Sequence, residues 1–337
     1  MIRSFSGKDR AWIRRAMSVH EVDVLIVGGG INGCGLARDL ALRGARVALV
    51  EKNDFAAGTS SRSSRLLHGG LRYLEEAYKL IPRPSAIRQI ALVFESVTER
   101  WRMSRLARHL ARPLPFVFPA LQGGRVSLAE VKLGVSLYDA LALGRNLPHR
   151  SLERADVLHQ LPTFDGARLK GGVLYYDYRT NDARMTLENA ISAHELGALV
   201  LSRARVTAPI VERTAGKKRL AGAIVHDDLA GESFHVRAKV IVSATGPWTD
   251  EALRALDLEK PSDHPQVRPT KGVHIVVPRE KLPLRSAAAL THPTDGRVLF
   301  ALPFDERSVL GTTDTDWTGS PDSVRVERAD VDYLLEA

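Results

Sequence analysis

The chain has 337 residues, of which 44% are hydrophobic and 26% are charged, a composition typical of a globular protein with two domains or one large α/β domain. A single cysteine, Cys34, excludes an internal disulfide framework and favours a reducing compartment. The formal charge of +9 favours anionic partners, but the basic residues show neither zinc-ligand spacing nor a helix-turn-helix pattern, so we expect no nucleic acid partner and no metal site.

Residues 1–20 are basic and lack the apolar core of a secretory signal. We expect them to form a flexible extension, with either Met1 or Met17 as the true start. No stretch of the chain reaches the ~18–20 consecutive apolar residues of a membrane-spanning helix.

A strand, a glycine-rich turn, a helix and a second strand are predicted next. Val22–Val27 is an apolar run typical of a buried strand, and Ala45–Val50 is predicted to be the second strand. Between them, Gly28, Gly30 and Gly33 form the pattern G-x-G-x-x-G. Their expected roles are a tight turn, a close approach of backbone to a pyrophosphate, and close packing of helix on strand. The N-terminus of the helix would bind the phosphates.

An acidic residue, Glu51, follows the second strand directly. In a dinucleotide site this carboxylate accepts hydrogen bonds from the ribose hydroxyls. It would repel a 2′-phosphate, which argues against NADP. The pattern therefore predicts a dinucleotide site but does not by itself separate NAD from FAD.

Later segments favour FAD. The Ser/Thr-rich stretch Gly58–Arg65 follows the second strand, where it could wrap a pyrophosphate and a ribityl chain. A distant predicted strand, Val240–Val242, ends in an Ala-Thr-Gly turn that could meet the same cofactor, and a strand near Arg205–Val206 could meet the adenine. Besides the residues named above, the predicted cofactor contacts are Thr59, Ser60, Ser61, Ser64, Leu66, His68, Val206, Ala244, Thr245, Gly246 and Trp248.

Several motifs in a fixed order carry a resemblance to a known family. They are GGGINGCGLARDLALRG, TSSRSSRLLHGGLRYLE, NDARMTLENA, VSATGPW, RPTKGVHIVVPR and FALPFDERSVLGTTDTDWTG. With them, the chain from about residue 20 to its end resembles the FAD-dependent glycerol-3-phosphate dehydrogenases. The resemblance implies FAD as cofactor, glycerol 3-phosphate as substrate and a membrane quinone as electron acceptor.

The resemblance also implies roles for the HGGLRY segment. His68 would lie beside the flavin or act as an acid or base, Arg72 would bind the phosphate or an oxyanion, and Tyr73 would donate a hydrogen bond to the substrate. From the residues alone, His68 could equally be a structural histidine, and Arg72 could form a surface salt bridge.

Two further candidates precede a predicted strand, Ile275–Val277. Strand alternation would place Lys271 and Val273 on one face and His274 on the other. By resemblance, both Lys271 and His274 lie at the substrate site, His274 as the favoured base and Lys271 as a charge. A structural role is an equally good reading of each residue from the sequence.

Residues 84–112 combine apolar residues at helical spacing with many arginines. This pattern fits a helix that lies on an anionic membrane surface, but also a domain-linking helix packed on its apolar side. The predicted apolar face is Ile87, Ile90, Ala91, Phe94, Val97 and Trp101, and the arginines are Arg88, Arg100, Arg102, Arg105, Arg108 and Arg112.

The expected fold is α/β, with a doubly wound, Rossmann-like FAD-binding domain in discontinuous segments and a β-rich substrate or cap domain. The resemblance places it among the D-amino-acid-oxidase-like flavoproteins. We expect residues 21–80 and 166–251 to form the FAD-binding domain, and residues 81–165 and 252–337 to form the substrate domain.

Two motifs of the resembling family, Gly-Val-Arg-Pro and Gly-Gly-Lys-x-Thr-Thr-Tyr-Arg, are not found in the sequence, so we expect a form that lacks the C-terminal part of the enzyme. The favoured function is oxidation of sn-glycerol 3-phosphate to dihydroxyacetone phosphate by hydride transfer from C2 to flavin N5. The alternatives are an oxygen-using glycerol-3-phosphate oxidase and a catalytically silent FAD-binding remnant. Further expectations are a cytoplasmic location on the inner face of the membrane and either a homodimer or a complementing C-terminal polypeptide.

Overall fold

The computed structural model describes residues 5–70, 84–124, 126–214, 217–258 and 265–336. The chain forms two compact units, and each contains segments that are distant in sequence. Unit 1 comprises residues 1–63, 181–269 and 318–322, and unit 2 comprises residues 64–180, 270–317 and 323–337.

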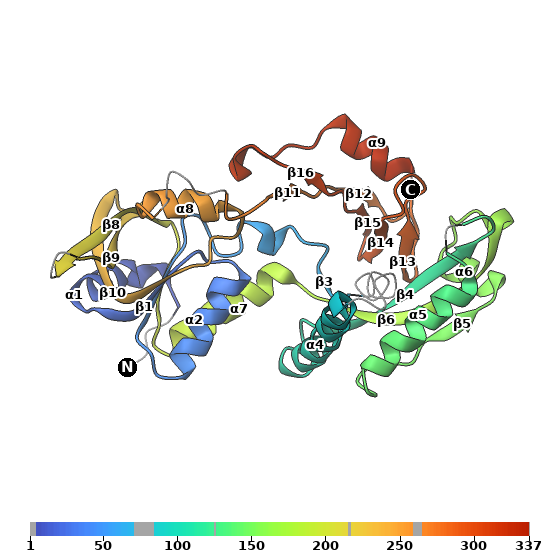
Figure 1. The fold of residues 1–337 in the computed structure, drawn as a ribbon, viewed down its shortest axis with the longest axis horizontal. Helices are drawn as coiled ribbons and strands as arrows, with labels where there is room; N and C mark the ends of the chain where they lie inside the picture. The colour runs from blue at the N-terminus through green and yellow to red at the C-terminus, as the bar shows by residue number, and fades with distance from the viewer. Residues whose placement is uncertain (1–4, 71–83, 125, 215–216, 259–264, 337) are drawn as a thin grey trace. The chain divides into compact units, whose positions relative to one another are not determined.

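Unit 1 is built on a six-stranded sheet in the order β7-β2-β1-β10-β9-β8 (Figure 1). The first four strands of this order are parallel, and β10, β9 and β8 form an antiparallel meander. The bounds of the strands are β1 Val22–Val27, β2 Val47–Val50, β7 Leu199–Leu201, β8 Ala204–Thr214, β9 Lys217–Asp227 and β10 Glu232–Ser243.

Helices cover both faces of the parallel strands, because the strand residues alternate between two cores. Ile26 and Leu49 pack with α2 (Ile31–Leu42) and α7 (Asp182–Glu195), which lie side by side in Figure 1. Leu25 belongs to the second core, together with residues of α1 (Arg10–Val19) and of the β8–β10 meander. The last helix of unit 1, α8 (Thr249–Ala255), packs against β8.

Residues 5–20 differ from the expected flexible extension. They contain α1, whose Ile13 and Met17 are buried in the core of unit 1. Arg10 and Arg14 of the same helix pair with the buried carboxylate of Asp227, at 2.7 and 3.2 Å. The apolar spacing of residues 13 and 17 gives the helix a buried face, and the ion pairs hold its start. The flexible extension was therefore a wrong prediction.

Unit 2 is β-rich and contains an eight-stranded sheet, in which β12-β15-β14-β13-β4-β6-β3 are neighbours and β5 pairs with β6. Strands β11 and β16 form a separate two-stranded sheet. The bounds of the strands are β3 Leu66–Leu67, β4 Arg112–Leu121, β5 Arg150–Leu152, β6 Leu169–Arg179, β11 Thr270–Lys271, β12 His274–Pro278, β13 Ala287–Thr291, β14 Val298–Phe304, β15 Arg307–Gly311 and β16 Thr315–Asp316.

The helices of unit 2 pack on different parts of its sheet. Helices α4 (Pro84–Leu106) and α5 (Leu128–Leu141) share one hydrophobic core with β4 and β6. Helix α6 (Arg154–Gln160) contributes to a second core with the same strands. The last helix, α9 (Arg328–Glu336), contributes Leu334 to a small cluster with Val273 and Leu299.

The buried face of helix α4 matches the predicted one only in part. Val97 of the predicted apolar face is buried, together with Val93, whereas Ile87 and Phe94 of that face are 71% and 40% exposed. Arg100, expected among the surface arginines, is only 3% exposed because it pairs with a buried carboxylate of β6. The prediction of a helix was correct, but its burial is decided by partners that are distant in sequence.

The expected fold class is confirmed, with a doubly wound α/β unit and a β-rich unit, each built from discontinuous segments. The division of the chain differs from the expected domain boundaries. Residues 64–70 and 166–180 belong to unit 2 because β3 and β6 pair with each other, and residues 252–269 belong to unit 1. Among the described helices, none has the length and apolarity to span a bilayer.

Candidate functional site

A cavity of about 650 Å³ lies in unit 1 at the carboxyl ends of β1, β2 and β10. This volume falls within the ~300–1,000 Å³ of small-molecule and cofactor sites, and the carboxyl ends of parallel strands are where α/β sheets bind ligands. The predicted contacts that line the cavity are Gly28, Gly30, Glu51, Thr59, Ser60, Val206, Ala244, Thr245, Gly246 and Trp248.

The glycine turn after β1 leaves no room for side chains. Gly28 has a φ of +110°, and a Cβ there would lie 2.5 Å from the carbonyl oxygen of Ala244. A Cβ on Gly33 would lie 1.9 Å from the carbonyl oxygen of Gly28. The turn can therefore fold back on the first turn of α2 and against the end of β10 only with glycine at both positions, as the spacing predicts.

The N-terminus of α2 opens into the cavity. Gly30 is its N-cap residue and, as a glycine, has no side chain that could cap the helix. Instead, the hydroxyl of Ser60 accepts a hydrogen bond from the backbone N–H of Ile31, at 2.9 Å. Ser60 and Ile31 both line the cavity. A helix N-terminus with accessible N–H groups is a favourable position for phosphate oxygens.

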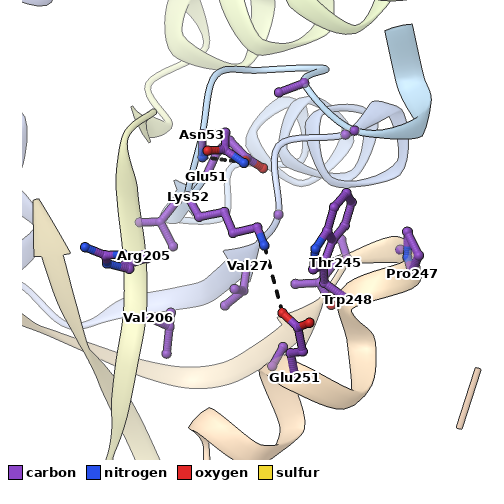
Figure 2. Close-up of a pocket in the computed structure, with 18 of the residues that line it drawn as sticks. Val27, Glu51, Lys52, Asn53, Arg205, Val206, Thr245, Pro247, Trp248 and Glu251 are labelled. Carbon is purple, nitrogen blue, oxygen red and sulfur yellow. Dashed lines mark hydrogen bonds and ion pairs between the residues drawn. The ribbon is translucent and has the colours of Figure 1, made fainter. Parts of the chain in front are cut away.

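Glu51 is held rigidly where β2 ends. Its carboxylate accepts hydrogen bonds from the N–H of Asn53, at 2.7 Å (Figure 2), and from the N–H of Gly29, at 2.6 Å. Each carboxylate oxygen can accept a further hydrogen bond. The geometry fits the predicted contact between Glu51 and a ribose diol.

One wall of the cavity carries a charged side chain, Lys52, that the sequence motifs did not indicate. The ammonium of Lys52 lies 4.5 Å from the ring centre of Trp248 and 4.0 Å from Glu251 (Figure 2). It also lies 3.4 Å from Asp322. The indole N–H of Trp248 donates to Asp322 at 3.0 Å. Only the position of Lys52, directly after Glu51, could have suggested that it lines the site.

A second cluster of predicted residues lies in unit 2. Ser64 and His274 are distant in sequence, yet the hydroxyl of Ser64 lies 2.9 Å from Nε2 of His274. His274 is half-buried at the start of β12, and its burial lowers the pKa of the imidazole. A neutral imidazole with a hydroxyl at this distance has the geometry of a general base and an alcohol.

Lys271 has a different environment from the expected one. Its ammonium is buried and pairs with Asp330 at 2.8 Å and Glu327 at 3.0 Å. The hydrogen bond to Asp330 raises the pKa of Lys271 despite burial, so the lysine stays charged. Lys271 and Val273 contact α9 whereas His274 contacts Ser64, but this does not come from alternation along one strand, because Lys271 ends β11 and His274 begins β12. The two carboxylates already neutralise Lys271, so the geometry does not support its expected role as a substrate cation.

The remaining predicted residues are placed as follows. Ser61 lies in a 3-10 turn, Thr59–Ser61, and its hydroxyl donates to the carbonyl of Gly58 at 3.4 Å. Leu66 belongs to β3, and His68 follows that strand with an exposed side chain. Arg72 and Tyr73 lie outside the described residues. Among the side chains that the structure describes, no group of three His, Cys, Asp or Glu could hold a metal ion.

The family model described as FAD dependent oxidoreductase matches residues 23–337, which is nearly the whole chain. The chain belongs to this family. Its cofactor, predicted from the sequence, is thereby confirmed as FAD at the level of the family. The cavity of unit 1 fits this group, because the glycine turn, the open helix N-terminus and Glu51 suit a pyrophosphate and a ribose.

Two curated relatives carry related names. The chain is 38% identical to an alpha-glycerophosphate oxidase of Streptococcus pyogenes serotype M6, over 98% of this chain and 52% of the relative. It is also 38% identical to an aerobic glycerol-3-phosphate dehydrogenase of Staphylococcus haemolyticus, over 99% of this chain and 57% of the relative. The chain thus spans about half the length of the curated relatives it matches.

A solved structure agrees with these matches. The glycerol-3-phosphate dehydrogenase from Bacillus halodurans complexed with FAD superimposes with a TM-score of 0.76, at 32% identity, over 98% of this chain and 55% of that one. An L-proline dehydrogenase from P. horikoshii, with a TM-score of 0.65 at 15% identity, shares the fold alone. The resemblance identified from the sequence motifs is therefore confirmed.

Proposed function

We propose that the chain carries the FAD-binding and catalytic-base portions of an enzyme that oxidises sn-glycerol 3-phosphate to dihydroxyacetone phosphate. FAD supplies the hydride acceptor, flavin N5, for the hydride that leaves C2 of the substrate. His274 accepts the proton of the C2 hydroxyl. Arg72 and Tyr73 would bind the phosphate and the substrate oxygens, and His68 would lie beside the flavin.

The contact between Ser64 and His274 carries this proposal. Ser64 presents a hydroxyl at 2.9 Å from Nε2 of His274, the position that a substrate alcohol needs for proton transfer. Because burial lowers the pKa of His274, the ring is neutral and ready to accept a proton near neutral pH. The names of the curated relatives supply the substrate.

Two electron acceptors suit the proposal. One matched relative is named an oxidase and another a dehydrogenase, so the names favour neither oxygen nor a membrane quinone. We propose a membrane quinone as the acceptor. Oxygen is the alternative, and the rate of flavin reoxidation distinguishes the two. We also propose a cytoplasmic location, and as partners a second copy of the chain or a complementing C-terminal polypeptide.

The proposal is tested by loading the purified chain with FAD and adding sn-glycerol 3-phosphate without oxygen. We expect the visible flavin absorption to bleach, and glycerol without phosphate to have no effect. Air or a soluble quinone is then added, and the faster reoxidation identifies the acceptor. A chain that binds FAD but is never bleached would be the silent FAD-binding module instead.

The role of His274 has its own variant in this experiment. His274→Asn should slow the bleaching by about 10²- to 10⁴-fold, the usual contribution of a general base. In the parent chain the rate should fall only below about pH 6.5, the ordinary histidine pKa, because burial lowers the pKa of His274. His235→Asn, which changes an exposed histidine of β10, is the matched control. Equal rates for the two variants would contradict the base assignment.

We further propose that α4 contacts an anionic membrane surface. Ile87 and Leu106 are 71% and 77% exposed, and the helix also carries the exposed Arg102 and Arg105. Exposed apolar side chains flanked by arginines favour the interface of an anionic bilayer. This placement brings the chain to the phase in which a quinone is dissolved.

Vesicle co-sedimentation tests this contact. The chain should bind vesicles that contain phosphatidylglycerol, and binding should weaken with salt and with neutral phosphatidylcholine vesicles. The double variant Ile87→Asp, Leu106→Asp should lose most of the binding. Leu229→Asp, which introduces one such charge at a residue that is 68% exposed in the β9–β10 turn, should keep it. Equal losses in both variants would reject α4 as the contact.

A further inference from the structure

A buried polar cluster in unit 2 joins three elements. It consists of Arg100 from α4, Tyr138 from α5 and Asp177 from β6, which are 3%, 0% and 3% exposed. Arg100 donates from Nη1 to Oδ1 of Asp177 and, at 2.8 Å, to the hydroxyl of Tyr138. The hydroxyl of Tyr138 donates in turn to Oδ1 of Asp177, at 2.7 Å.

Burying this polar cluster in the core has a high free-energy cost. A buried ion pair loses the hydration of both charges, and apolar residues of similar volume are often as stable. Within the described part of the chain, Nε and Nη2 of Arg100 are buried and have no hydrogen-bond acceptor. The stability of the core alone therefore does not explain why these polar residues are buried. Their contacts with the backbone explain it.

Gly69 is the backbone residue that the cluster holds. Its N–H donates to the hydroxyl of Tyr138 at 2.7 Å and lies 3.3 Å from Oδ1 of Asp177. A Cβ at this position would lie 2.3 Å from the Tyr138 hydroxyl and 2.4 Å from Cγ2 of Val97. The chain is thus both hydrogen-bonded and sterically pressed onto the cluster at Gly69.

The residues on either side of Gly69 are those assigned to the flavin and the substrate. His68 precedes it with an exposed side chain, and Arg72 follows three positions later. We propose that Arg100, Tyr138 and Asp177 are positioning residues, which hold the backbone at Gly69 so that the neighbouring His68 reaches the reacting molecules. This role rests on the proposed oxidation of glycerol 3-phosphate.

The protonation state of Tyr138 agrees with the cluster acting as a clamp, by which we mean that its hydrogen bond with Gly69 is permanent. Burial, followed by the charge of Asp177, raises the pKa of Tyr138 well above its ordinary value. The phenol therefore keeps its proton for Asp177, and its oxygen remains an acceptor for the N–H of Gly69 and for Arg100. The hydroxyl of Tyr138 therefore changes neither its charge nor the direction of its hydrogen bond with Gly69 over the physiological pH range.

The variant Tyr138→Phe tests the clamp in the full chain loaded with FAD. It removes one hydroxyl and keeps the buried ring. We expect the amide of Gly69 to exchange with deuterium at least about tenfold faster, because it loses its shorter acceptor. The rate of flavin bleaching by glycerol 3-phosphate should fall about 10- to 100-fold, as for a displacement of about 1 Å at a reacting group.

Tyr175→Phe is the matched control. Tyr175 is 2% exposed, lies on β6 in the same core and packs edge-on against Tyr138, with ring centres 6.4 Å apart. It takes no part in the hydrogen bonds to Gly69. Both variants should keep similar FAD affinity and thermal midpoints, while only Tyr138→Phe changes exchange and bleaching. The same exchange and bleaching rates in both variants would overturn the proposal.

Two further results separate the clamp from the proposed function. If the parent chain is never bleached, the oxidation proposal fails, and faster exchange at Gly69 in Tyr138→Phe still supports the clamp, whereas unchanged exchange overturns it. If Tyr138→Phe does not fold, Gly69→Ala replaces it, since the added Cβ displaces the backbone without removing any cluster residue. Normal bleaching in a folded Gly69→Ala chain would overturn the positioning role.

Discussion

At the scale of single residues, two nearby basic residues of the same motif take opposite roles. Lys271 is buried against Asp330 and Glu327, so its charge is already neutralised. His274 is half-buried and contacts an uncharged hydroxyl, so burial lowers its pKa and leaves a neutral ring that can accept a proton. The partner, more than the residue type, determines which of the two can act on a substrate.

Glu51 gives a prediction at the same scale. The variant Glu51→Gln should bind FAD about tenfold more weakly, because a charged acceptor of two ribose hydroxyls becomes a neutral amide. Titration of the apo chain with FAD, followed by flavin fluorescence, measures the change in Kd. Asp54→Asn is the matched control, since Asp54 is exposed and does not line the cavity. An unchanged Kd for Glu51→Gln would contradict the ribose contact.

At the scale of elements, α9 is held to unit 2 by contacts that its own sequence does not reveal. Asp330 is 5% exposed on the buried side of the helix and pairs with Lys271, from β11. Burial tends to raise the pKa of Asp330, but the hydrogen bonds from Lys271 and from the N–H of Glu327 outweigh it and lower the pKa. The exposed side of the same helix carries an Arg328–Asp332 pair, which surface geometry makes weak.

The pair predicts how stability depends on pH. Because the folded pKa of Asp330 is lowered, its contribution is present above the ordinary aspartate pKa of about 4 and is lost as the pH falls through the lower folded value. Because the folded pKa of Lys271 is raised, its contribution is lost only as the pH rises through that higher value. Both charges therefore stabilise the fold throughout the neutral range.

Lys271→Met should lower the thermal midpoint at pH 7 by at least about 5 °C, because it leaves the carboxylate of Asp330 buried without its partner. The double variant Lys271→Met, Asp330→Leu should recover most of the loss, since apolar residues can replace a buried pair. Arg328→Met, on the exposed side of α9, should change the midpoint little. A double variant as unstable as the single one would show that the pairing does not explain the loss.

At the scale of the whole molecule, the chain divides its proposed chemistry between two units. The cavity for FAD and its polar walls lie in unit 1, whereas Ser64, His274 and the Arg100–Tyr138–Asp177 cluster lie in unit 2. The segment 318–322 belongs to unit 1, although the segments on both sides of it in the chain belong to unit 2. Its Asp322 accepts a hydrogen bond from the indole N–H of Trp248, which lines the cavity. The chain spans about half the length of its curated relatives, so activity is the property that the bleaching experiment must establish.

The sequence by itself determined the dinucleotide half-site and the family. The roles of Gly28, Gly33 and Glu51 follow from spacing within one strand-turn-helix-strand unit, whose geometry is local and depends on backbone sterics. The start of α7 follows the same kind of local rule, because the side chain of Asn181 accepts a hydrogen bond from the N–H of Arg184 one turn later. Local rules are visible in a sequence because the interacting residues lie close together along the chain.

Only the tertiary structure determined which charged groups are buried and which partners they have. Neither the burial of Arg100 nor the pairing of Lys271 with α9 follows from the neighbouring residues, because the partners lie 77 and 59 positions away along the chain. The packing of α1 depends in the same way on Asp227. Such contacts form when folding removes water from both partners, and the free energy of a buried charge depends on the partner that it meets there.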